Sequence, residues 1–209
     1  MKIKSLILSV AVLATVLTGC GKKAADTTAP AKTDAKPAAT DTKPATDAVT
    51  TASVVNDNAA FEKALTKDGG KYVVATLKDL TFDKELVVDG DCKTGKKDAN
   101  GALVKDKDGN EATQRKIALY TQDDKHVVTA RFTLTAPKIT FNSNYGSLEH
   151  GTFKGDVYVA GKNFKLVNTK VEGNLYFLNQ EAKDTFTIAD TKTDTVASVV
   201  TGKTELAAK

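Results

Sequence analysis

Two stretches of the chain are copies of one another. LEHGTFKGDVYV (148–159) aligns without gaps to LVNTKVEGNLYF (166–177), at an offset of 18 residues. The matched pairs are Leu148 with Leu166, Phe153 with Val171, Gly155 with Gly173, Tyr158 with Tyr176, and Val159 with Phe177. A unit this short cannot bury its apolar side chains alone, so neighbouring copies must stack to complete a core. The repeat therefore restricts the domain to architectures in which short units pack side by side.

Weaker copies flank this pair. Ile139-Thr140-Phe141 falls on the columns of residues 157–159, one period earlier, with Pro137 at the glycine position. FTIADTKTDTVASVV (186–200) resembles a degenerate later copy. The repeated region thus extends beyond its two clearest members.

The spacing of apolar residues predicts a mainly β domain. Side chains alternate between the two faces of an extended strand, which places Phe153, Val157 and Val159 on one side and Tyr158 on the other. Helical periodicity does not return after residue 70. Stacked units of this kind predict a short, single-domain parallel β-helix. An antiparallel β-sandwich stays open as the alternative, because a period of about 18 residues also accommodates two strands and two turns.

A short amphipathic helix is expected before the strands. Asn56-Asp57-Asn58 offers N-cap candidates, Phe61, Ala64 and Leu65 form one apolar stripe, and Gly69-Gly70 provides a stop. A helix this short is unstable in isolation. We therefore expect it to dock on the strands as an N-terminal cap.

Two parts of the domain resemble known β-helix families. FEKALTKDGGKYVVATLKDLTFDKELVVDG (61–90) resembles the opening of right-handed β-helix proteins of the pectin-lyase-like class, where a helix caps the first rung. FKGDVYV and VEGNLYF resemble the rungs of bactofilins, which are polymer-forming β-helices. Both resemblances imply a fold, and neither includes the catalytic residues of polysaccharide lyases.

The N-terminus has the pattern of a secretory signal. A basic start, Met1–Lys4, precedes the apolar run Leu6–Leu17, which is shorter than the roughly 20 residues that span a bilayer. Leu17-Thr18-Gly19-Cys20 resembles the lipobox of bacterial lipoproteins. The resemblance implies removal of residues 1–19 and acylation of Cys20. An ordinary signal peptide with a chance cysteine, or a membrane-spanning anchor, is the alternative.

This reading predicts an extracytoplasmic protein that is lipid-anchored at the cell membrane of a bacterial envelope. Two or three acyl chains anchor a protein stably, whereas one chain binds marginally. The membrane is then a partner through the lipid at Cys20.

The segment after the cysteine predicts a disordered tether. Of residues 21–50, 28 are Ala, Thr, Lys, Asp or Pro, and Val49 is the only large aliphatic residue. Such a composition buries too little apolar area to offset the entropy lost on ordering. The expected organisation is a tether over 20–51 and a β-rich domain over 52–209, with a polar hairpin inserted at about 91–115.

The charge of the domain does not indicate nucleic-acid binding. Residues 52–209 contain 23 Lys or Arg and 22 Asp or Glu, a net charge of +1. The only arginines are Arg115 and Arg131, whereas sites that read bases or clamp phosphates usually use more. We expect no nucleic-acid partner.

Several acidic residues are candidates for chemistry, and each also has a structural explanation. The run Asp106–Glu111 resembles part of a calcium loop but lacks the further acidic residue before the glycine and the final glutamate. Asp89 and Asp91 flank Gly90 and are more simply explained as turn residues that bind local backbone amides. We predict no catalytic residue, metal site or cofactor. A carbohydrate-active enzyme is the alternative, with acids Asp89, Asp91, Asp156 and Glu172 as its candidates.

The remaining reactive side chains form no recognisable constellation. Cys92 has no intramolecular partner once Cys20 is acylated, so it is expected to be a partly buried residue, with a free thiol or an intermolecular bridge as alternatives. His126 and His150 occur in unrelated contexts, a turn and a rung corner. Zinc sites require clusters of ligands.

Three tyrosines are candidates for glycan binding. Tyr158 and Tyr176, with Tyr145, could form an exposed aromatic strip on which sugars stack, or simply stabilise a sheet. The sequence thus predicts a non-catalytic envelope lipoprotein that binds an envelope polysaccharide or protein, or that self-associates. The enzyme alternative stays open at this stage.

Overall fold

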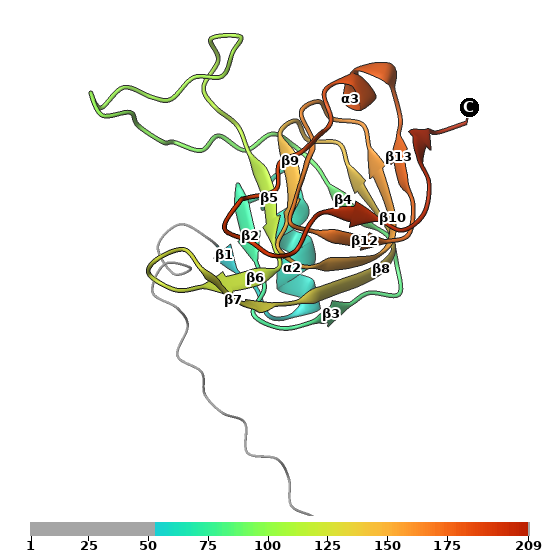
Figure 1. The fold of residues 1–209 in the computed structure, drawn as a ribbon. Helices are drawn as coiled ribbons and strands as arrows, with labels where there is room; N and C mark the ends of the chain where they lie inside the picture. The colour runs from blue at the N-terminus through green and yellow to red at the C-terminus, as the bar shows by residue number, and fades with distance from the viewer. Residues whose placement is uncertain (1–52, 209) are drawn as a thin grey trace, which may run out of the picture. The chain divides into compact units, whose positions relative to one another are not determined.

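The computed structural model describes residues 53–208 and is mainly β (Figure 1). The predicted signal peptide, Cys20 and the predicted tether therefore lie outside the described residues. The strands are β1 (Ser53–Val54), β2 (Val73–Ala75), β3 (Leu80–Thr81), β4 (Leu86–Val88), β5 (Arg115–Ala118), β6 (Tyr120–Gln122), β7 (Val128–Arg131), β8 (Thr133–Phe141), β9 (Gly146–Glu149), β10 (Thr152–Val159), β11 (Lys165–Val167), β12 (Lys170–Glu172), β13 (Leu175–Phe177), β14 (Thr187–Ile188), β15 (Val199–Val200) and β16 (Thr204–Leu206); the helices are α2 (Asn58–Leu65) and α3 (Gln180–Asp184).

Two parallel sheets make up most of the domain. One has the order β1-β2-β5-β9-β11-β14. The other runs β15-β12-β10-β13-β16, with β8 beside β10 and β3 and β4 beside β8. The chain runs from a strand of the first sheet into the second sheet. It then returns to the first sheet, where its next strand pairs with the earlier one. We call these passages repeats one to five: β2–β4, β5 with β8, β9 with β10, β11–β13, and β14–β16.

The pairing directions decide between the two predicted architectures. Every pair in the two large sheets is parallel, and β6–β7 is the antiparallel pair among the named strands of residues 53–208. A meander or sandwich built from hairpins would pair successive strands antiparallel. The antiparallel β-sandwich alternative is therefore wrong.

The 18-residue repeat is the register of the sheets. The predicted matches are strand partners: Leu148 with Leu166, Phe153 with Val171, Tyr158 with Tyr176, and Val159 with Phe177. Residues 139–141 pair with 157–159 as the earlier copy requires. In the degenerate last copy, Ile188 pairs with Leu166 and Val200 with Val171. Their offsets are 188 − 166 = 22 and 200 − 171 = 29, so repeat five contains an insertion.

The core lies between the sheets and is built from columns of aligned side chains. Val157, Val159, Leu175 and Phe177 are at most 1 % exposed, while Tyr158 between two of them faces outward and is half-buried. Each such aliphatic or aromatic side chain contributes about 1.5–3 kcal/mol when removed from water. Because partners from neighbouring repeats share one column, burial and register stabilise each other.

One corner of the stack has no room for a side chain. A Cβ on Gly155 would lie 1.9 Å from the Ala136 carbonyl oxygen, and one on Gly173 would lie 2.1 Å from that of Gly155. Gly155 also has φ +136°, and the register shifts there, so that Ala136 and Pro137 both face it. Pro137 is accommodated at the equivalent position of the preceding copy, because the bulge removes that position from the hydrogen-bonded ladder between the strands.

A polar column runs beside the glycine column. The Asp156 Oδ1 accepts hydrogen bonds from the Asn174 backbone N–H at 2.8 Å and from its Nδ2 at 2.9 Å. The Asn174 Oδ1 in turn accepts from the Lys203 backbone N–H at 2.9 Å. These side chains satisfy backbone donors at a turn where strand pairing is interrupted.

Helix α2 covers the first repeat. It begins after Asp57, whose side chain accepts from the Ala60 N–H at 2.8 Å, and it ends at Leu65, before the predicted glycines. Phe61, Ala64 and Leu65 are buried in the core cluster as predicted. The Asp89 N–H donates to the Leu65 carbonyl at 2.9 Å, which ties the helix end to the loop after β4.

Arg115, 2 % exposed, fixes the same end of α2. Its NH2 group donates to the carbonyls of Leu65 (2.5 Å) and Asp89 (3.1 Å), and NH1 donates to Lys71 O (3.0 Å) and to the Cys92 Sγ (2.9 Å). A cation at a helix C-terminus interacts favourably with the helix dipole. Cys92 is half-buried and unpaired with another cysteine in the described residues.

The segment expected as an inserted hairpin projects from the body of the domain (Figure 1). Isolated antiparallel bridges join Lys93 to Thr113, Lys97 to Leu103, and Lys105 to Glu111. The projection thus contains two successive tight turns rather than long paired strands.

Substitutions in the glycine column test this packing. Gly173→Ala is expected to lower the free energy of unfolding of the full chain by about 1–3 kcal/mol, because its methyl group would overlap the neighbouring repeat. Gly109→Ala is the control: Gly109 has a positive φ but open space around it, so conformational strain of about 1 kcal/mol is expected. Urea denaturation measures both. If Gly173→Ala costs no more than Gly109→Ala, the close approach of the repeats is wrong.

Candidate functional site

A cleft of about 640 Å³ lies on the outer face of the six-stranded sheet. Its floor includes Lys116 of β5, Glu149 of β9 and Lys165 of β11. These residues face outward because they alternate with the buried Ile117, Leu148 and Leu166. The walls are two insertions: the β6–β7 hairpin in repeat two and the loop 189–195 in repeat five.

A lysine, a glutamate and a tyrosine are joined at the floor. The Lys116 Nζ lies 2.5 Å from the Glu149 Oε2 and donates to the Tyr120 hydroxyl at 3.0 Å. The Ser147 hydroxyl donates to the Glu149 Oε1 at 2.9 Å. Burial by itself would lower the pKa of Lys116, but Glu149 and Tyr120 outweigh it and the pKa is raised. The ammonium group is therefore retained as a fixed cation.

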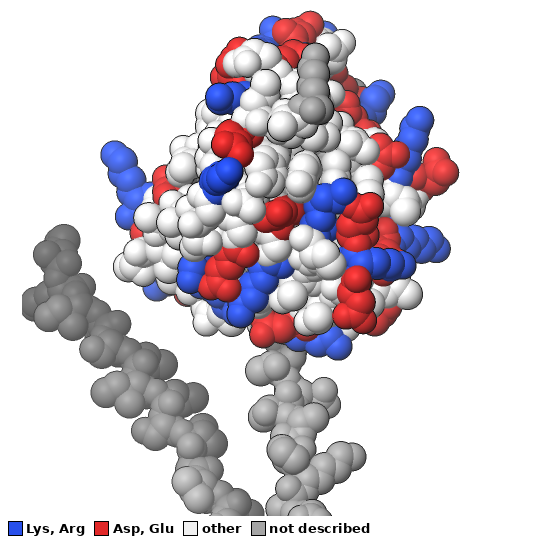
Figure 2. Space-filling view, turned by 90° about the vertical axis from the view of Figure 1, so that its right-hand side faces the viewer, with Lys and Arg blue, Asp and Glu red and all other residues white. Residues whose placement is uncertain are grey.

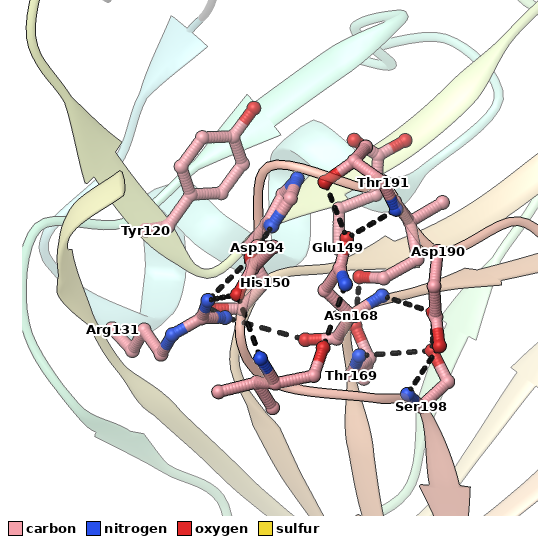
Figure 3. A network of polar contacts seen from close by, with 12 residues as sticks. Tyr120, Arg131, Glu149, His150, Asn168, Thr169, Asp190, Thr191, Asp194 and Ser198 are labelled. Carbon is pink, nitrogen blue, oxygen red and sulfur yellow. Dashed lines mark hydrogen bonds and ion pairs between the residues drawn. The ribbon is translucent and has the colours of Figure 1, made fainter. Parts of the chain in front are cut away.

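Asp194 connects the two walls. Its carboxylate accepts from the Arg131 guanidinium at the end of β7, from the His150 Nδ1 at 2.8 Å, and from the Val196 backbone N–H at 2.9 Å. Figure 3 shows the Arg131 and His150 side chains directed at this carboxylate. Burial alone would raise the pKa of Asp194, but the bonds from Val196, Arg131 and His150 lower it to about 2. The carboxylate is thus a permanent anion between two walls.

His150 occupies the centre of the cleft. Its φ is +57°, and its backbone N–H donates to the Val167 carbonyl at 2.8 Å. The ring of Tyr120 packs on it at a centroid distance of 4.4 Å. Arg131 NH1 also donates to the His150 carbonyl at 2.8 Å. The histidine is therefore held by both its backbone and its ring.

The loop of the second wall is shaped by Asn168 and Asp190. Asp190 accepts from the Asn168 N–H and the Ser198 N–H, both at 2.7 Å, and Asn168 donates to the Val196 carbonyl at 2.6 Å. The Thr191 N–H donates to the Asn168 Oδ1 at 3.0 Å. Burial alone would raise the pKa of Asp190, but the hydrogen bonds from Ser198 and Asn168 lower it. Figure 3 shows this network behind the ion pairs.

The arrangement favours binding over proton transfer. A general acid or base works best when its pKa lies near the operating pH, whereas Asp194 and Lys116 are shifted away from neutrality. The cleft offers a ligand the Tyr120 ring, the exposed Lys165 and several threonine hydroxyls. The hydroxyls are those of Thr191, Thr193 and Thr195.

The three candidate tyrosines do not form one strip. Tyr158 and Tyr176 lie on neighbouring strands of the eight-stranded sheet, with ring centroids 5.0 Å apart, and the Lys138 Nζ lies 5.2 Å from the Tyr158 centroid. Tyr145 precedes β9 of the other sheet. Its hydroxyl is buried without a hydrogen-bond partner, and burial raises its pKa. The tyrosine pair has the geometry of cross-strand packing.

Three of the four candidate acids have separate structural partners. Asp91 holds Asn144 through bonds of 2.7 and 2.9 Å, and Asp156 holds Asn174 as described above. The Glu172 carboxylate lies 2.7 Å from the Lys170 ammonium, which lowers its pKa. The Asp89 side chain is exposed. These contacts lie in different turns and strands and do not bring the four acids together in one site.

Two expectations about the histidines and the calcium-like loop have clear outcomes. His126 and His150 were expected in unrelated contexts, yet both line the cleft, because the β6–β7 turn folds over the sheet. The Asp106 Oδ1 accepts from the N–H groups of Asp108 (3.0 Å) and Asn110 (2.9 Å) of its own turn. Within residues 53–208, no group of three or more potential ligands could hold a metal ion.

Sequence reasoning missed the ion-paired cleft. Arg131 and Asp194 are 63 residues apart, and neither belongs to a motif. The available signal was the scarcity of arginine, because both arginines hold separate parts of the fold together: Arg115 donates to the carbonyl of Leu65 at the end of α2, and Arg131 pairs with Asp194. On the face seen in Figure 2, Lys or Arg side chains lie beside Asp or Glu side chains, so charges of both signs are mixed there.

Comparison with protein-family models, curated proteins and solved structures found no match. In the part of the chain that the structure describes, no helix is both long and apolar enough to cross a membrane.

Asp194→Asn tests the tie between the walls. A carboxylate with a lowered pKa stabilises the folded state above its unfolded pKa of about 4, and this stabilisation is lost as the pH falls towards about 2. The variant is expected to lose about 2 kcal/mol of unfolding free energy at pH 7 and to show a flatter dependence between pH 4 and 2. Urea titrations across this range measure the effect. Asp124→Asn, in the exposed hairpin turn, is the control, and an equal response in both variants would contradict the assignment.

Proposed function

We propose that the repeats form a short parallel β-helix with α2 as its N-terminal cap, carried by a lipid-anchored protein of the bacterial envelope. Parallel pairing between successive repeats, shared core columns and the docked helix support the architecture. The lipobox-like Leu17–Cys20 and the Ala/Thr/Lys/Asp/Pro composition of residues 21–50 support the anchor and the tether.

Within this arrangement, the domain has a non-catalytic binding role, and its ligand occupies the cleft. The observation that carries this proposal is that Lys116, Glu149, Arg131 and Asp194 are committed to ion pairs. These groups define the shape of the cleft rather than supply a free acid or base. Two other residues that line the cleft, the half-buried Tyr120 and the exposed Lys165, suit recognition.

The ligand class that fits best is an anionic envelope saccharide. Tyr120 offers a ring face for a sugar, threonine hydroxyls offer donors and acceptors, and Lys165 offers a cation for a carboxylate or phosphate. Envelope polymers are within reach of a tethered domain. The alternative of a carbohydrate-active enzyme rests on the resemblance to β-helix families alone, since Asp91, Asp156 and Glu172 have separate partners and Asp89 is exposed.

The anchor is tested by Cys20→Ser in the full chain. Without the thiol no diacylglycerol can be attached, so the protein is expected to leave the membrane fraction and to lose the label of a metabolic fatty-acid probe. Fractionation and labelling measure both effects. Cys92→Ser is the matched control and should retain membrane association and label. Retention of the label by Cys20→Ser would refute the lipidation.

The cleft is tested with peptidoglycan pulldown and a glycan array that contains uronic acids and phosphorylated sugars. Lys165→Ala is expected to weaken binding about tenfold, which corresponds to about 1.4 kcal/mol. Lys183→Ala, on the exposed surface of α3, should bind normally. Tyr120→Ala should also reduce binding, and Tyr158→Ala should not. If Tyr158→Ala alone abolishes binding, the tyrosine pair and not the cleft is the site.

A further inference from the structure

The last repeat leaves the core columns open. Leu148 and Leu166 are fully buried, but their partner in the next repeat, Ile188, is 55 % exposed. Val159 and Phe177 are buried, but the next residue of their column, Leu206, is 41 % exposed. These side chains occupy core positions and are exposed because no sixth repeat within residues 53–208 lies over them.

The opposite end of the stack is closed. In repeat one, Val74, Leu80, Leu86 and Val88 are at most 3 % exposed, since α2 packs on that repeat and β1 pairs with β2. At the last repeat, β14, β15 and β16 each stand at the edge of a sheet with one strand neighbour. Among residues 53–208, exposed apolar columns and unpaired edges thus coincide at this end, whereas α2 covers the core at the other end, where β1, β3 and β4 also have one strand neighbour each.

We propose that a second copy of this chain covers this end, with the two β16 strands paired antiparallel across a two-fold axis. Each chain has one such end. When this end contacts the same end of a second chain, both contact surfaces are occupied and the assembly is complete at two copies. A stack with two open ends would instead extend into a filament. This inference does not depend on the ligand or on the anchor proposed above.

The sequence of β16 is complementary to itself. In an antiparallel pair centred on Thr204, Lys203 of each copy faces Glu205 of the other, and opposite charges at such positions stabilise strand pairing. Within one copy these two side chains already form an exposed ion pair at 3.6 Å. In the same register Leu206 of each copy lies opposite Gly202 of the other, so the second strand covers Leu206 and reduces its contact with water.

The chain's own tether is a poor alternative occupant. Apart from Val49, residues 21–50 contain no large aliphatic or aromatic side chain that could cover the exposed columns. A second copy brings an unpaired strand edge whose charges are complementary to those of β16.

Disulfide trapping in the full-length, membrane-associated protein tests this inference. In Thr204→Cys, the two new thiols face each other across the axis, at a spacing that a disulfide can bridge. Oxidation is expected to give a covalent dimer on a non-reducing gel. Thr81→Cys, an exposed threonine of β3 at the closed end, is the matched control and should not cross-link, and the unsubstituted chain reports any background from Cys92.

A second substitution distinguishes specific pairing of the two β16 strands from cross-linking that results only from crowding of the chains. Leu206→Asp in the Thr204→Cys chain replaces an apolar side chain of the contact with a charged one, so the dimer band should be lost while the circular dichroism spectrum of the chain is unchanged. Equal cross-linking of Thr204→Cys and Thr81→Cys, absence of the band in Thr204→Cys, or persistence of the band after Leu206→Asp would each overturn the proposal. Species larger than a dimer in Thr204→Cys alone would also overturn it, because a two-fold contact is closed.

Discussion

Stacking of parallel strands in register is the constraint on which the rest of this domain depends. No repeat has enough residues to enclose its own apolar side chains, so each one relies on the repeats above and below. Val171, for example, is buried because Phe153 and Val200 share its column. A shift of one residue would turn the whole apolar set outward. Core burial therefore fixes the register, and the register determines which backbone groups meet at the corners between the strands.

At the corners, backbone groups meet instead of side chains. Gly155 and Gly173 let one repeat approach the next to contact distance, and Asp156 and Asn174 satisfy the donors that the turn removes from the ladder. These two columns are adjacent in sequence and perform different tasks. The glycine column prevents steric overlap, and the Asp156–Asn174 column satisfies backbone polar groups. Both are required where a strand bends.

The sequence could predict the repeated part of the fold because its period is uninterrupted. Leu148 and Leu166 align in sequence and pair in space, and the helix stripe of Phe61, Ala64 and Leu65 is buried as its spacing requires. Earlier and later repeats are separated by insertions, so their alignment fades although the pairing persists. The cleft could not be predicted for the same reason: Arg131 and Asp194 lie in separate insertions, and only the fold brings them together.

The insertions also explain why charge, and not apolar burial, organises the cleft. The hairpin and the 189–195 loop lie outside the core columns, so burial of large side chains cannot fix their positions. Asp194, bonded to Arg131 and His150, joins them at a point shielded from water, where a charge-assisted bond is stronger than on an open surface. The stack supplies a rigid floor, and a few ionic contacts set the spacing of the walls. A site built in this way can change its ligand through loop residues such as Thr193 and Thr195 without disturbing the repeats that support it.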